Sequence, residues 1–127
     1  MSNAPHFARN ARKGEVIGFD SLESILLNDG LKDAFTGESM GNTGEAVAHE
    51  HGISREQADE FAVRSHYLAN RASEEGWLES EVFAVGSLVK DEGVRPETSK
   101  GVLSDLSAVF LEGGQVTAGN SSQISDG

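Results

Sequence analysis

The sequence predicts a mostly helical chain whose few short strands belong to a larger sheet. Three observations support this prediction: a capping motif that opens a long helical repeat, two further short helical segments, and strand-like segments that lie far apart. Because an isolated strand leaves backbone groups unpaired and one face uncovered, we expect these strands to need neighbours from outside the segment.

The first third of the chain predicts loops and two helices. Residues 1–18 contain a proline and two glycines and are predicted to form a loop. Residues 20–30 have three leucine or isoleucine side chains at helical spacing and end in glycine, so we predict a short helix. Residues 31–41 are predicted as a loop that leads to a helix at residues 43–51, which Gly52 ends.

The strongest local signal is the sequence Ser54-Arg55-Glu56-Gln57, which has the spacing of a capping box. Small and apolar residues then recur on one helical face, and these are Ala58, Phe61, Ala62, Ser65, Leu68, Ala69 and Ala72. Gly76 follows the last turn. We predict a long amphipathic helix whose narrow stripe packs closely against another element.

The last third of the chain predicts two strands and one helix. Residues 81–85 (EVFAV) and residues 115–118 are candidate strands, and residues 98–106 form a short helix after Pro96. The glycine pair at residues 113–114 predicts a turn.

The composition excludes several classes of function. The 127 residues carry 21 acidic against 10 basic side chains, a formal net charge of −11, so we expect no binding to a nucleic-acid backbone. The sequence has no apolar run long enough to span a membrane and no visible secretory signal. It also lacks cysteine, which excludes disulfides and thiolate metal sites.

The residues alone predict no catalytic machinery and no metal site. His49 and His51 are two positions apart, a spacing that points them to different sides of a helix. His66 is expected to be solvated on the polar side of the long helix. Ser121 and Ser122 follow a glycine and an asparagine but lack the G-x-S-x-G arrangement of a serine nucleophile.

Six segments, in the same order along the chain, resemble the motifs of the thiolase family. They are MSNAPH, DGLKDAF, MGNTGEAVA, GISREQADEFAVRSHYLANRA, DEGVRPETS and VTAGNSSQISDG. The resemblance covers essentially the whole chain. It implies the later part of the N-terminal half of a thiolase, including the inserted loop domain that covers the active site and binds coenzyme A (CoA).

The resemblance implies a partial α/β thiolase fold, in which a mostly helical loop domain carries a few short strands of a larger mixed sheet. Residues 1–112 would be the loop domain, and residues 113–127 would begin the strand and turn that return to the core. The family's nucleophilic cysteine lies upstream of the matched region, and its histidine and second cysteine lie downstream. We therefore expect an internal fragment that is inactive by itself.

The activity implied is that of an acyltransferase, which cleaves 3-ketoacyl-CoA with CoA or condenses two acyl-CoA molecules through an acyl-cysteine. Fatty acid metabolism and a cytoplasmic location would follow. CoA would be a substrate, with no prosthetic group or metal. The implied partners are the remaining thiolase core and further copies in a homodimer or homotetramer, with no nucleic acid and no membrane.

Seven residues match CoA-binding positions of the family. Arg95 matches the arginine at the adenine and phosphate end of CoA, and Ser122 matches a serine that hydrogen-bonds the pantetheine arm. The remaining matches line the pantetheine and acyl channel, and they are Leu31, Met40, Leu106, Phe110 and Ala118. Two departures, Ser39 in place of a histidine and Gly44 in place of an alanine, leave the acyl-chain preference open.

Other interpretations of these residues remain open. Without the resemblance, Arg95 would be a solvated surface arginine, residues 118–121 a tight turn, and the apolar residues plain core. The chain could also be a non-catalytic interaction or oligomerisation module derived from a thiolase loop domain. A third possibility is that the chain alone folds poorly because its strands lack partners.

Overall fold

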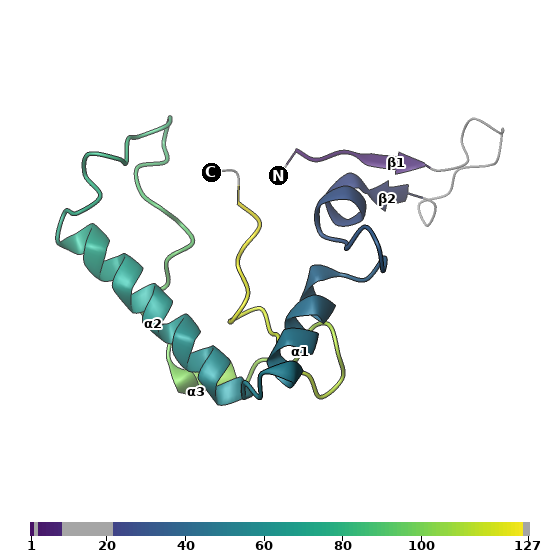
Figure 1. Ribbon diagram of the computed structural model, residues 1–127. Helices are drawn as coiled ribbons and strands as arrows, with labels where there is room; N and C mark the ends of the chain where they lie inside the picture. The colour runs from purple at the N-terminus through teal and green to yellow at the C-terminus, as the bar shows by residue number, and fades with distance from the viewer. Residues whose placement is uncertain (2, 9–21, 126–127) are drawn as a thin grey trace.

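The computed structural model describes residue 1, residues 3–8 and residues 22–125 (Figure 1). Within these residues the elements follow one another in the order β1 (His6–Ala8), β2 (Leu22–Ser24), η3 (Leu26–Gly30), α1 (Met40–Glu50), α2 (Arg55–Glu74) and α3 (Lys100–Ser104). Among these helices, none is long and apolar enough to cross a membrane.

Strands β1 and β2 form a two-stranded antiparallel sheet in which Phe7 lies opposite Glu23. The prediction of a loop over residues 1–18 is therefore wrong at β1, and the predicted helix over residues 20–30 is wrong at β2. The rest of residues 1–18, and the start of the predicted helix, lie largely outside the described residues. Strand β1 supplies hydrogen-bond partners to the backbone of β2. The weak helical periodicity of residues 20–30 does not outweigh this stabilisation.

Within the described part of the predicted helix over residues 20–30, the helical turn is Leu26–Gly30. The turn η3 is a π-helix, closed by the Leu31 amide, which donates to the carbonyl of Leu26 over 3.0 Å. Gly30 does not have the left-handed conformation common at the end of a helix, because the wide turn continues directly into Leu31.

The loop that follows η3 agrees with its prediction up to Ser39. The carboxylate of Asp33 accepts hydrogen bonds from the amides of Phe35 and Thr36, at 2.9 and 2.6 Å. These bonds lower the pKa of Asp33 below its ordinary value, and the bond from the Thr36 amide has the largest effect. Gly37 has a φ of 73°, and the loop turns back there towards α1.

Helix α1 begins three residues before its predicted start. The hydroxyl of Ser39 accepts a hydrogen bond from the amide of Asn42 at 3.3 Å and so caps the helix. The predicted end is confirmed, because Gly52 follows with a φ of 62°.

Helix α2 confirms the capping box. The amide of Gln57 donates to the hydroxyl of Ser54 at 3.3 Å, and the amide of Ser54 donates to Oε1 of Gln57 at 2.8 Å. The predicted stripe is only partly covered: Ala62 is buried, whereas Phe61 is 69% exposed. Helix α2 packs against α3.

Helix α3 is shorter than its predicted range of residues 98–106, and Ser99 caps it. Both predicted strands are wrong. Within the described chain, residues 81–85 make only the isolated bridge of Val85 to Leu88, and residues 115–118 make only that of Thr117 to Ala108. No described strand lies beside either segment to extend a ladder.

The described chain has little apolar core. Its buried apolar residues are Ala48, Ala62 and Leu103. The accessible surface of 10111 Å² exceeds the roughly 6,500 Å² expected for a folded monomer of this mass. Figure 1 shows α1 and α2 diverging from a common end, with the C-terminal segment (residues 115–125) running up between them. This segment, and not an apolar core, is where the two helices share their contacts.

Candidate functional site

The C-terminal segment is held to α1 by one buried carboxylate. Glu45 lies on α1 and is 8% exposed. Its side chain accepts hydrogen bonds from the amide of Gln115 at 2.9 Å and from the amide of Val116 at 2.7 Å. A charged acceptor strengthens both bonds, so Glu45 fixes the backbone at the start of the segment.

A second buried carboxylate, that of Asp59 on α2, holds the same segment from the other side. Asp59 is 4% exposed. Its Oδ1 accepts from Nδ2 of Asn120 at 3.0 Å, and its Oδ2 accepts from Nε of Arg55 at 2.8 Å. The segment is therefore fastened to both helices by polar groups that have little water around them.

Asn120 shapes the segment into a tight turn. Its Nδ2 also donates to the carbonyl of Gln115 at 2.8 Å, and its Oδ1 accepts from the amide of Thr117 at 2.8 Å. Thr117 is fully buried, and its hydroxyl accepts from the amide of Gly119 at 3.2 Å. These bonds leave Ala118 and Ser122 exposed on the outer side of the turn.

Arg55 joins α3 to this arrangement. Its Nη2 donates to the carbonyl of Leu103 at 2.6 Å and to the carbonyl of Leu106 at 2.9 Å. These two carbonyls lie at and just beyond the end of α3, and that of Leu103 also accepts from the amide of Leu106 at 3.1 Å. One carboxylate, that of Asp59, thus connects the end of α3 with the turn that carries Ser122.

The structure brings Leu106 close to Gly119, the residue that follows Ala118. A Cβ on Gly119 would collide with the side chain of Leu103 and would lie 2.7 Å from Cδ1 of Leu106. The absence of a side chain at Gly119 therefore lets the backbone beside Ala118 lie directly on α3.

Three further predicted residues lie together at the start of α1. The amide of Met40 donates to the carbonyl of Leu31 at 3.0 Å. The ring of Phe110 lies against Gly41, where an added Cβ would collide with it. Leu31 is thus joined to Met40 by a backbone hydrogen bond, and Phe110 lies beside the residue that follows Met40. The side chains of Met40 and Phe110 are exposed.

Arg95 contacts helix α2 rather than the C-terminal turn or the start of α1. Its backbone amide donates to Nδ1 of His66 at 3.2 Å, so His66, predicted to be solvated, is half-buried and also has a partner in the protein. A Cβ on Gly93 would lie 3.0 Å from Cδ of Gln123. The loop of Arg95 therefore passes beside the residue that follows Ser122. Among the described residues, no hydrogen bond or ion pair joins Arg95 directly to the other six predicted residues.

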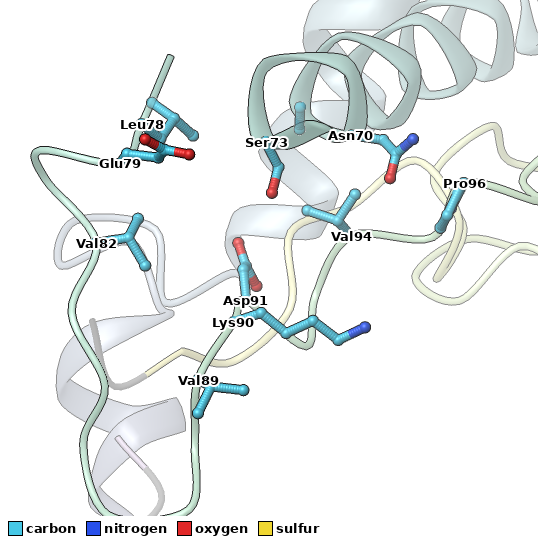
Figure 2. A pocket seen from close by; sticks show the side chains of 11 residues that line it. Asn70, Ser73, Leu78, Glu79, Val82, Val89, Lys90, Asp91, Val94 and Pro96 are labelled. Atoms are coloured by element: carbon cyan, nitrogen blue, oxygen red, sulfur yellow. The ribbon is translucent and has the colours of Figure 1, made fainter. Parts of the chain in front are cut away.

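A pocket of about 430 Å³ lies beside this loop, between the end of α2 and residues 78–96. Val94 and Pro96, which flank Arg95, are part of its lining. Figure 2 shows Ser73 and Asp91 reaching into it from α2 and from the loop. Its size suits a small-molecule group. Within the described residues, no cluster of three histidine or carboxylate side chains could hold a metal ion.

Sequence reasoning missed the polar residues that hold the site together. Glu45, Arg55, Asp59 and Asn120 each occur within a segment that carries the family resemblance. The motifs therefore include these four residues. The motifs do not indicate their roles, because no sequence pattern tells which partner a polar residue will have 48 to 71 residues away.

The comparisons with known proteins place the whole chain in one family. The family model described as "Thiolase, N-terminal domain" matches residues 1–127. A probable acetyl-CoA acyltransferase of Staphylococcus aureus (strain COL) is 41% identical over 136 residues, which cover 100% of this chain and 35% of that protein. The chain thus spans about a third of the length of the curated relatives it matches.

Solved structures agree. An acetyl-CoA acetyltransferase from Syntrophomonas wolfei superposes with a TM-score of 0.83 at 35% identity, over 92% of this chain and 31% of that one. A human mitochondrial 3-ketoacyl-CoA thiolase in complex with CoA superposes with a TM-score of 0.78 at 34% identity, over 92% and 30%. These matches confirm the prediction of a partial thiolase fold, and the chain belongs to the thiolase family.

Proposed function

We propose that residues 1–127 are the CoA-binding part of a thiolase. This enzyme cleaves 3-ketoacyl-CoA with CoA, or condenses two acyl-CoA molecules, through an acyl-cysteine intermediate. The chain contains no cysteine and grips the cofactor-like handle of the substrate, while the reacting sulfur belongs to the rest of the enzyme. By itself the chain would be inactive.

The observation that carries the proposal is the arrangement of the C-terminal segment. Leu106 lies against the turn of Ala118, and the loop of Arg95 passes beside Gln123, next to Ser122. Residues that are far apart in sequence thus lie along the same C-terminal segment. A long and narrow ligand requires contacts spread along such a segment. A structure that matches 92% of this chain is that of a thiolase in complex with CoA, which supports the same ligand here.

Each proposed contact suits the part of CoA that it would meet. The guanidinium of Arg95 can stack on the adenine and pair with phosphate oxygens. The hydroxyl of Ser122 can hydrogen-bond an amide of the pantetheine arm, and the small Ala118 lets the backbone approach that arm. Binding energy from this remote handle orients the thioester for attack.

The proposal also covers the surroundings of the chain. Residues 1–112 would be the loop domain, and residues 113–127 the return to the thiolase core. The complete protein would be a homodimer or homotetramer in the cytoplasm, with a role in fatty acid metabolism. The 98% exposed side chain of Phe35 and the 81% exposed side chain of Phe83 fit a chain that packs against further protein.

The same exposed apolar surface favours a second candidate, a non-catalytic interaction or oligomerisation module. A titration separates the two candidates. A CoA-binding part takes up CoA with a measurable affinity when it sits in a complete thiolase, whereas an interaction module associates with protein and ignores CoA.

The experiment uses a complete thiolase built around this chain. Residues 1–127 replace the matching segment of the Syntrophomonas wolfei enzyme, which supplies the remainder of the fold. In this chimera we expect Arg95→Ala to raise the KM for CoA about tenfold, because it removes a charge-assisted contact of about 1–2 kcal/mol, and to leave kcat nearly unchanged.

The matched control is Arg64→Ala, which removes an exposed arginine from α2. It should leave both constants as they are. An Arg95→Ala enzyme whose KM for CoA equals that of the unmodified chimera would refute the proposed role of Arg95.

A further inference from the structure

We propose that Asp59 is a positioning residue that fixes the end of α3 and the turn of Ser122 relative to each other, so that both can grip one CoA molecule. The inference rests on the proposed function, since it names what holds that binding site in shape. Asp59 would touch no substrate atom and would act through Asn120 and Arg55.

The first argument is that the two carboxylate oxygens of Asp59 accept hydrogen bonds from different residues. Oδ1 of Asp59 accepts from Asn120, which shapes the turn two residues before Ser122. Oδ2 accepts from Arg55, whose Nη2 in turn donates to the carbonyls of Leu103 and Leu106. Each oxygen thus serves a different segment, and both segments carry predicted CoA contacts.

The second argument is burial. The side chain of Asp59 is 5% exposed, so water cannot replace a partner that is lost. An aspartate offers two acceptor oxygens, whereas an asparagine offers one acceptor and one donor group. Asp59→Asn has nearly the same shape but cannot accept from Asn120 and Arg55 through separate oxygens. One of the two segments is then released.

The third argument is a comparison within the same helix. Arg71 and Glu75 form a pair with the same residue spacing and the same Nε to carboxylate geometry, at 2.7 Å. Their side chains are 48% and 39% exposed, and neither side chain hydrogen-bonds a distant segment within the described part of the chain. The pairing of an arginine with a carboxylate four residues later is therefore common to both sites, and the distant partners distinguish Asp59.

The test measures steady-state kinetics in the chimera. We expect Asp59→Asn to raise the KM for CoA about tenfold, as the loss of one buried charge-assisted hydrogen bond implies, and to change kcat less than about twofold. Glu75→Gln, the matched control, should leave both constants unchanged. A purely structural role would instead lower the amount of active enzyme, and so the apparent kcat, at a constant KM. That result would overturn the inference.

A second variant keeps the test decisive if Asp59→Asn folds poorly. Asn120→Ala removes the donor to Asp59, together with the bonds of Asn120 to the Gln115 carbonyl and the Thr117 amide, and leaves α2 and Arg55 in place. We expect a similar rise in KM from this change. When Asp59→Asn is added to Asn120→Ala, KM should rise by less than about twofold, because the connection between Asp59 and the turn is already broken and one acceptor oxygen remains for Arg55. Independent, multiplying effects would contradict the proposal.

The two proposals fail in different ways. If the unmodified chimera is folded by circular dichroism but shows no saturable dependence on CoA, the proposed function is wrong. If the unmodified chimera saturates with CoA and neither Asp59→Asn nor Asn120→Ala raises the KM, only the positioning role is wrong.

Discussion

An arginine–carboxylate ion pair lies near each end of α2, and the carboxylate is buried in the first pair and exposed in the second. Near the start, Arg55 and Asp59 are four residues apart with Nε and Oδ2 at 2.8 Å, and near the end, Arg71 and Glu75 repeat this at 2.7 Å. The first pair reaches α3 and the C-terminal turn. The second lies at the surface, where Arg71 also lies over the ring of Trp77 at 5.6 Å from its centroid.

This difference teaches that the helix determines the pair and the tertiary partners determine its importance. Local spacing alone brings an arginine and a carboxylate together on one face of α2. Only at the first pair does the guanidinium also satisfy backbone carbonyls of another element. The buried pair thus organises a site, while the exposed pair is a feature of the helix surface.

The largest expected effect is on stability, when the arginine of each pair is replaced by methionine. Arg55→Met leaves Asp59 buried without its cation and removes the guanidinium hydrogen bonds to the carbonyls of Leu103 and Leu106, so we expect the free energy of unfolding of the chimera to fall by about 3 kcal/mol. Urea unfolding followed by circular dichroism measures this change.

Arg71→Met provides the counterpart in the same measurement. Its pair is exposed, so the free energy of unfolding should stay within experimental error of the unmodified value. Equal losses from the two substitutions would show that the distant partners of Arg55 contribute nothing, and the comparison would collapse.

A smaller effect is expected from the other buried carboxylate. Glu45→Gln places an amide group against the amides of Gln115 and Val116, where at most one oxygen can still accept. We expect a loss of about 2 kcal/mol in the same urea experiment. Glu50→Gln, on the exposed end of α1, is the control and should be neutral. If Glu45→Gln is neutral as well, Glu45 does not fasten the segment to α1.

The sequence predicted the elements that depend on local chemistry. The capping box at Ser54 and the glycine ends at Gly52 and Gly76 were predictable, because a hydroxyl, an amide or a left-handed glycine acts within a few residues of its own position. The turn at residues 113–114 follows the same rule, with Gly113 at a φ of 70°.

The predictions failed where the partner is distant. Strand β2 was predicted as helix because its pairing with β1 depends on residues 6–8, which lie well before it in the sequence. Residues 81–85 have the composition of a strand, yet the described chain offers them no neighbouring strand and they remain exposed. Strand formation depends on such a neighbour, and composition does not reveal it.

For the candidate site, the resemblance supplied residues but not their support. Leu106, Ala118 and Phe110 came from motif positions, and their closeness to other predicted residues became visible only in the structure. The support from Glu45 and Asp59 was not predicted, because burial of a helical carboxylate depends on what packs above it. The roles of the seven residues in CoA binding stay predictions.

The most direct test of the central claim is hydrogen exchange of the complete chimera with and without CoA. If the C-terminal segment grips the ligand, CoA should slow exchange at the amides of residues 115–123 and of residues 93–97, and it should leave the exposed residues 81–89 unchanged. Exchange that stays the same at residues 115–123 when CoA is saturating would contradict the account.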